Sequence, residues 1–182
     1  MAFNINDMRS QLVTGGARPT LFQVRLQNPA NSAGDVKFPF MCTATQIPAS
    51  TVGTIPVLYF GREVKFAGDR TFEPWNVQVL NDEDFLIRNA LEEWSGNLNK
   101  HEGNIREYDA PLQYKSTAQV IQYSKTGVPI REYTFHGIWP AQIDPIDLDW
   151  SNQNAIELFG VTFEYDWWSV SGGSTGNAGG PF

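Results

Sequence analysis

A regular alternation of apolar and polar residues near the end of the chain most constrains how this sequence can fold. Five large apolar side chains occupy every second position: Phe159, Val161, Phe163, Tyr165 and Trp167. Successive side chains of a strand point to opposite faces, so this period of two predicts a half-buried β-strand. Aromatic residues make up 13% of the 182-residue chain, which suits strands better than a helical bundle.

Other segments repeat this strand pattern. We expect residues 21–26 and 36–44 to form one hairpin and residues 117–123 and 130–138 to form another, with a further strand at 71–80. In total, we expect about seven or eight strands and one helix. The sequence therefore predicts a mainly β fold of two packed antiparallel sheets, a sandwich or barrel with a flanking α-helix.

The helix is predicted over residues 82–95. Asn81 can cap its first turn, which carries acidic residues, and Gly96 can end it. One helical stripe is apolar: Leu86, Ile87, Ala90, Leu91 and Trp94. Phe85 falls off that stripe and is therefore either simply solvent-exposed or a contact residue.

Residues 55–66 differ from the alternating strands. Their first half places apolar side chains on both faces of an extended segment: Ile55, Val57, Leu58, Tyr59 and Phe60. One interpretation is a fully buried core strand. The other is an arm that packs on another subunit, because large exposed apolar patches usually mark interfaces.

The length suggests one domain with appendages. We expect an N-terminal arm at 1–17, a β domain at 18–168 that includes a hairpin at about 47–66, and a flexible Gly/Ser-rich tail at 169–182. The long polar loop at 97–111 is a further candidate for contacts between subunits.

The charge is uneven along the chain. The formal net charge is -7, and the first 80 residues carry seven of the 13 Lys and Arg but only five of the 20 Asp and Glu. An acidic protein is a poor generic nucleic-acid binder, since that binding needs cations to displace counterions. The asymmetry either gives two faces of opposite sign, which favours head-to-tail association, or vanishes as the fold mixes the halves.

No motif predicts an enzyme. The sequence has no nucleotide-binding glycine pattern and no nucleophile elbow. Cys42 is the only cysteine and fits a buried structural thiol; His136 fits a structural imidazole. We therefore expect no catalytic residues and no cofactor.

Two weaker alternatives remain in the sequence, and a membrane span is not one of them. Asp144, Asp147 and Asp149 could supply oxygen ligands to calcium, but the EF-hand pattern is absent, and we expect a solvated loop or an interface. The tryptophans and tyrosines could stack on sugars in a carbohydrate-binding module. The longest apolar stretch, residues 55–60, is far short of the roughly 18–20 residues that span a bilayer.

The order of several short strings carries more information than composition. They are RPTLFQV at 18–24, ATQIPA at 44–49, AGDRTF at 67–72, WNVQV at 75–79, GIWP at 137–140 and LDW at 148–150. Together these strings resemble the tail tube proteins of T4-like contractile-tailed bacteriophages, from about residue 18 to 168. Two departures are a longer loop at 28–35 and the tail at 169–182.

The resemblance implies a function. In that family, six copies form a ring whose sheets join into one inner β-barrel, and rings stack into a tube that pierces the host envelope and conducts viral DNA. It further implies a virion protein, assembled in the host bacterial cytoplasm, whose partners are other copies of itself, the tail sheath protein, the baseplate hub, the tape-measure protein and the tail terminator. The hairpin at 47–66 would reach the adjacent ring.

Two alternatives stay open at this point. A tube subunit of a related contractile injection or secretion device would have the same fold but a different cargo, and a carbohydrate-binding β-sandwich would bind glycans as a monomer. If the chain forms a DNA-conducting tube, we expect an acidic or neutral lumen, because a basic wall would bind the phosphates of passing DNA.

Overall fold

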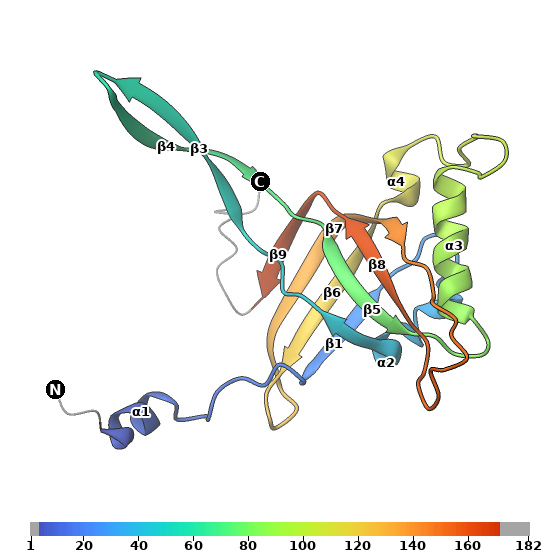
Figure 1. Cartoon of the computed structure of the whole chain (residues 1–182), viewed down its shortest axis with the longest axis horizontal. Coiled ribbons are helices and arrows are strands. Elements are labelled where there is room, and N and C mark those ends of the chain that lie inside the picture. Colours follow the sequence, from blue (N-terminus) through green and yellow to red (C-terminus); the bar gives the residue numbers. More distant parts are fainter. Residues whose placement is uncertain (1–3, 172–182) are drawn as a thin grey trace.

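Antiparallel strands dominate the structure, a computed structural model that describes residues 4–171 (Figure 1). The strands are β1 (Phe22–Leu26), β2 (Cys42–Thr45), β3 (Thr51–Tyr59), β4 (Arg62–Thr71), β5 (Trp75–Leu80), β6 (Ser116–Tyr123), β7 (Pro129–Ile143), β8 (Leu158–Glu164) and β9 (Trp167–Ser171). The helices are α1 (Ile5–Gln11), η1 (Ser32–Gly34, a 3-10 turn), α2 (Phe38–Met41), α3 (Leu86–Leu98) and α4 (Pro111–Tyr114). The mainly β prediction is confirmed.

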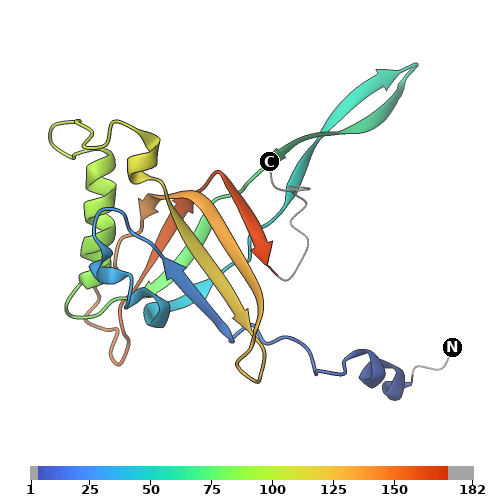
Figure 2. The same cartoon turned by 180° about the vertical axis from the view of Figure 1, so that it is seen from behind.

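Strand β7 belongs to two layers. The strands follow the order β1-β6-β7-β8-β5-β2, and β9 also pairs with β7. The first part of β7 pairs with β6 and β9, whereas its end, from Trp139 to Ile143, pairs with β8. One layer is therefore β1–β6–β7–β9, seen from the front in Figure 2, and the other is β7–β8–β5–β2.

Glycine makes the bend in β7 possible. Gly137 has a φ of 70°, a conformation that side chains with a Cβ rarely adopt, and a Cβ there would overlap the Asp166 carboxylate. The Lys115 ammonium lies 2.6 and 2.7 Å from the two oxygens of that carboxylate. The bend is thus held by a charged contact beside a glycine that leaves room for it.

The core lies between the two layers. Trp75 of β5 stacks on Phe135 of β7 with ring centroids 4.4 Å apart, and Phe163 of β8 packs against the same indole. Helix α3 closes one end of the sandwich with Trp94, whose Nε1 donates a hydrogen bond to the carbonyl of Tyr114 at 3.0 Å.

The first predicted hairpin is wrong. Strand β1 pairs with β6, and β2 pairs with β5 in the other layer. The intervening loop redirects the chain, because the Asn28 side chain accepts from the Ala30 amide and donates to the Ala90 carbonyl of α3 at 2.8 Å. The second predicted hairpin is confirmed, since β6 pairs along its whole length with the part of β7 from Pro129 to Ile138.

The helix begins later than predicted. Asn81 is buried and donates to the Glu157 carboxylate at 2.8 Å, so it does not cap α3. The acidic residues that follow form a turn in which Asp82 and Asp84 share the Lys37 ammonium. The helix therefore starts at Leu86, and it continues through Gly96 to Leu98.

Two predicted strands are divided in the structure. The strand expected at 71–80 is interrupted before Trp75, because Thr71 still belongs to β4. The alternating segment at 159–167 is divided at Tyr165 and Asp166, and Trp167 starts β9 with 41% of its surface exposed. Strand β9 reaches Ser171, inside the segment expected to be tail; residues 172–182 lie outside the described residues.

Candidate interaction surfaces

The β3–β4 hairpin projects away from the sandwich (Figure 1), and all residues of β3 are exposed. Directly opposed residues share a face of an antiparallel pair. Ile55 lies opposite Phe66 and Val57 opposite Val64, and these four side chains are 45–55% exposed. The interpretation of this segment as a buried core strand is wrong, because the residues between 4 and 171 leave this apolar face open to solvent.

The other face of the hairpin is mixed. Leu58 lies opposite Glu63, and Pro56 lies opposite Lys65. Leu58 is therefore apolar on the face opposite to Val57, as the sequence indicated, but β4 places charged residues beside it. The hairpin is amphipathic, with one apolar face and one face that water can solvate.

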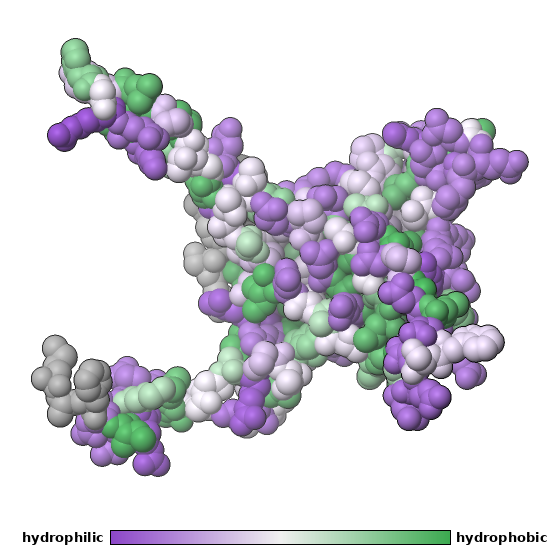
Figure 3. All heavy atoms as spheres, viewed as in Figure 1, coloured by the Kyte–Doolittle hydropathy of each residue, from purple (hydrophilic) through white to green (hydrophobic). Residues whose placement is uncertain are grey.

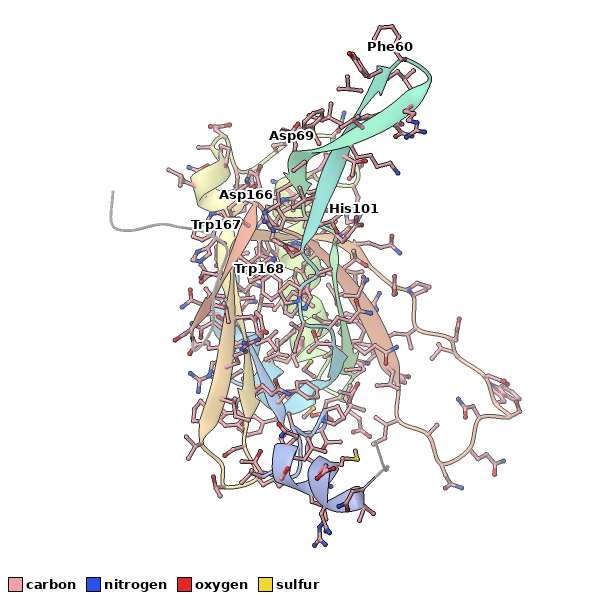
Figure 4. All side chains as sticks on the ribbon, turned by 90° about the vertical axis from the view of Figure 1, so that its left-hand side faces the viewer. Phe60, Asp69, His101, Asp166, Trp167 and Trp168 are labelled. Atoms are coloured by element: carbon pink, nitrogen blue, oxygen red, sulfur yellow. The ribbon has the colours of Figure 1, made fainter. Side chains whose placement is uncertain are left out.

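The tip of the hairpin combines exposure with an unusual backbone. Phe60 and Gly61 form a two-residue turn in which both residues have positive φ, 45° and 81°. Such turns favour Asn-Gly, and a bulky residue in this conformation is strained. Phe60 lies at the end of the hairpin (Figure 4) and is 91% exposed, and its ring meets the neighbouring Tyr59 ring edge-on with the centroids 4.6 Å apart. Local stability does not explain a phenylalanine here.

Phe85 lies apart from the hairpin. It precedes α3 with a φ of 50° and is 39% exposed. The body of the sandwich separates α3 from β3 and β4 (Figure 1). The six candidate contact residues therefore form two separate surfaces, five on the hairpin and one at the start of α3.

The N-terminal arm is a third surface. Helix α1 is only seven residues long and buries none of them. Isolated helices shorter than about 12–15 residues are marginal in water. Its apolar residues Ile5 and Met8 are 74% and 64% exposed, so the arm lacks the packing that would stabilise a helix of this length.

A fourth surface is the acidic loop, for which the sequence left open a solvated loop or an interface. The loop between β7 and β8 exposes Leu148 and Trp150, which is 101% exposed, and it curls around a hollow lined in part by Asp147 and Ile156. The signal was present in the LDW string, where two apolar residues flank an aspartate without any strand pattern. This loop and the hairpin lie at opposite ends of the molecule in Figure 1.

Cys42 and His136, the residues considered for chemistry, both lie in packed surroundings. Cys42 is partly buried, and burial raises the pKa of its thiol to about 12, which keeps it protonated at neutral pH. His136 stacks on Trp167 with centroids 3.9 Å apart, and its Nε2 lies 3.0 Å from the Ser169 hydroxyl. Burial lowers the pKa of this imidazole.

The acidic loop shows no metal geometry. Asp144 accepts from the Gln142 amide at 2.7 Å and Asp149 from the Ser151 hydroxyl at 2.7 Å. Between residues 4 and 171, no group of three or more Asp, Glu, His or Cys is placed to hold an ion. Within the same range, none of the helices has the length and apolar character that crossing a bilayer requires.

Taken together, these features define a β-sandwich protein with projecting segments whose apolar side chains the residues from 4 to 171 leave exposed. A family model described as phage tail tube protein matches residues 17–171. The chain is also 37% identical to tail tube protein gp19 of Enterobacteria phage T4 over 153 residues, covering 84% of this chain and 90% of gp19. The chain belongs to the phage tail tube protein family.

More distant likenesses agree with this assignment. The tail tube protein of Serratia phage KSP90 is 24% identical over 166 residues, covering 88% of this chain and 93% of the relative. Among solved structures, a chain of the anti-feeding prophage cap matches with a TM-score of 0.62 at 15% identity, covering 86% of this chain and 91% of that one. A chain of the extended sheath-tube complex of an extracellular contractile injection system matches with a TM-score of 0.56 at 14% identity, covering 89% and 96%. These two structures share the fold.

Proposed function

We propose that six copies of this protein close into a ring and that the rings stack into the inner tube of a contractile phage tail. The tube pierces the host envelope and conducts viral DNA. Membership of the tail tube family supports this role. The observation that best supports ring closure is a four-stranded layer whose two edge strands lack a second strand partner among the described residues. Exposed apolar segments flank this layer.

The β1–β6–β7–β9 layer is the one suited to a continuous barrel. Within residues 4–171, β1 has β6 as its only strand partner and β9 has only β7. Helix α2 packs beside β1 without adding a strand to it. Both edge strands are five residues long. Pairing β1 of one copy with β9 of the next would satisfy both rows of backbone groups and leave no edge exposed.

The outward face of this layer would then line the lumen. One row across it joins Arg25, Gln119, Thr134 and Ser169, and the next row ends with Glu132 opposite Ser171. In these two rows the charged side chains are one cation and one anion, Arg25 and Glu132, and the apolar Ile121 lies among the amides and hydroxyls. Duplex DNA carries about one negative charge per 1.7 Å, so a wall without excess positive charge lets it slide.

The projecting segments would join the rings. The apolar face of the hairpin, with Ile55, Val57 and Tyr59, has exposed surface that a neighbouring subunit can bury. Leu58 and Phe60 would extend this contact, whereas Phe85 would contact a neighbour from its separate surface at the start of α3. Burial of apolar surface contributes roughly 25 cal/mol per Å². The arm at 1–17 and the loop at 97–111 are the other segments proposed to contact neighbours.

The remaining proposed partners follow from the place of an inner tube within a contractile tail. We assign the other layer of the sandwich to the outside, where a tail sheath protein would surround it. The ends of the tube would meet the baseplate hub and the tail terminator, and a tape-measure protein would occupy the lumen before DNA. The protein would be a virion component assembled in the cytoplasm of the host bacterium, with no cofactor and no catalytic step.

Electron microscopy of the concentrated protein, paired with size-exclusion chromatography, tests this proposal. Rings or hollow tubes are the expected result, either alone or after addition of baseplate components. Val57→Asn on the apolar face should block them, whereas Thr54→Asn on the opposite face should not. A protein that stays monomeric even with baseplate components would contradict the proposed role.

A further inference from the structure

The loop at 145–158 carries an apolar and acidic hollow that the described part of the chain leaves open. Its lining includes Pro145, Asp147, Trp150 and Ile156. Trp150 is fully exposed and Ile156 is 68% exposed. An indole and an aliphatic side chain around a hollow form a site for an apolar side chain, and the cost of leaving them in water favours an occupant.

The charge of the loop indicates what that occupant carries. From 144 to 158 the sequence contains Asp144, Asp147, Asp149 and Glu157 and no Lys or Arg. Asp147 and Asp149 have no salt-bridge partner among the described residues. The occupant should therefore pair a large apolar side chain with neighbouring cations.

The hairpin tip has this combination. Phe60 projects into solvent beyond the ends of both strands (Figure 4), and hydrophobic residues gather at the outer end of the hairpin in Figure 3. Arg62 and Lys65 follow it within five residues, and neither forms a salt bridge within the described part of the chain. Glu63 is the one acid beside them.

We propose that the hairpin tip of one copy seats in the 145–158 loop of the next, with the Phe60 ring in the hollow and Arg62 near Asp147 and Asp149. The proposal rests on the self-assembly proposed above and names the surface that receives the hairpin. Tip and loop lie at opposite ends of one chain (Figure 1), so the contact joins unlike surfaces and can repeat from copy to copy. The strained φ of Phe60 fits this role, because the turn presents the ring to a partner instead of to its own chain.

Disulfide trapping tests the contact without requiring complete tubes. In a Cys42→Ala background, one variant carries Arg62→Cys and a second carries Asp149→Cys. The two are mixed and oxidised mildly, and the mixed dimer is measured on non-reducing gels. The matched control replaces Asp149→Cys with Glu102→Cys, another exposed acidic position on a different loop.

The expected result is that the target pair cross-links at least about tenfold faster than the control pair, because docking raises the effective concentration of the two thiols. Adding Phe60→Ala to the Arg62→Cys variant should remove most of this advantage. Salt at about 1 M, where the Debye length is about 3 Å, should reduce it as well, because Lys65 and Asp147 keep their charges in these variants.

Equal rates for the two pairs would overturn the proposal and would leave the loop to another protein of the tail. Tubes seen by microscopy without preferential cross-linking would contradict this contact while supporting the proposed function. Preferential cross-linking in a protein that forms no tubes with baseplate components would support this contact and contradict the proposed function.

Discussion

The sandwich and the hairpin use apolar residues in opposite ways. In the sandwich, Trp94 and Phe163 are fully buried, and among the described residues every buried side-chain polar atom has a hydrogen-bond partner. In the hairpin, Phe60 is 91% exposed and the apolar face lies open. A two-stranded hairpin is at best marginally stable by itself in water. The core of the sandwich is therefore complete in one chain, whereas the described residues leave the apolar face of the hairpin exposed.

The largest expected effect comes from the sandwich. Phe163→Ala would leave a cavity beside Trp75 and Trp94, whose rings lie 5.5 and 6.4 Å from the Phe163 ring. Truncations of this kind cost about 3–5 kcal/mol, a large share of the roughly 5–15 kcal/mol of a typical domain. Urea unfolding followed by tryptophan fluorescence measures the loss.

The matching change in the hairpin, Phe60→Ala, should leave the urea midpoint nearly unchanged, because no cavity forms at an exposed tip. Comparable destabilisation by the two substitutions would show that the hairpin belongs to the core, and the comparison between the two regions would fail.

A second test compares two glycines with similar backbone conformations. Gly137 and Gly61 have φ of 70° and 81°, but a Cβ at Gly137 would meet Asp166, whereas nothing lies within 4 Å of one at Gly61. Substitution by alanine should cost about 1 kcal/mol at either site from the backbone alone. Gly137→Ala should cost more, since the Asp166–Lys115 contact must also shift.

Thermal melts of Gly137→Ala and Gly61→Ala provide the measurement. We expect a clear drop in Tm only for Gly137→Ala, because opening of an exposed hairpin does not unfold the sandwich. An equal drop in both variants would mean that the hairpin and the sandwich unfold together.

Phe60→Asn should have effects of opposite sign on stability and assembly. Asparagine tolerates the left-handed conformation of this turn, so the change relieves about 1 kcal/mol of strain, offset in part by the lost contact with Tyr59. Amide exchange of Val57 and Val64 should slow by a few-fold. Tube formation should fall, since the exposed ring is gone; normal tubes would refute the tip as a contact.

The sequence predicted what depends on local pattern. Strands around Val24, Val120 and Phe163 alternate in the sequence and are buried in the structure, and the apolar stripe of α3 has Ile87, Ala90, Leu91 and Trp94 in the interior. The resemblance to tail tube proteins is confirmed. The pairing of the strands was harder to predict, because β1 joins a strand more than 90 residues further along the chain and no local signal specifies that partner.

Tertiary contacts decided the features that were missed. Asn81 had the right position for a helix cap, but its bond to Glu157 placed it in the interior. Asp166 appeared to continue a strand, but Lys115 and the bend at Gly137 turn the chain there. Of the candidate contact surfaces, the hairpin was visible as an unusual apolar run, whereas the loop around Trp150 showed only a short string of mixed character.

The smallest expected effect concerns His136, which lies in strand β7 of the sandwich. Burial against Trp167 lowers the pKa of this imidazole, so the unfolded chain binds a proton more readily than the folded one. The stability of the folded state should therefore decrease as the pH falls below about 6.5, and this contribution should vanish above it. Urea midpoints at about pH 7.5 and pH 5.5 measure the slope, and His136→Gln should flatten it.

The hairpin provides the control, because it holds no histidine between Thr51 and Thr71. Amide exchange of β3 and β4, corrected for the intrinsic rate, should therefore show no such dependence on pH. An identical slope in the variant would show that other groups control the acid side of the stability curve.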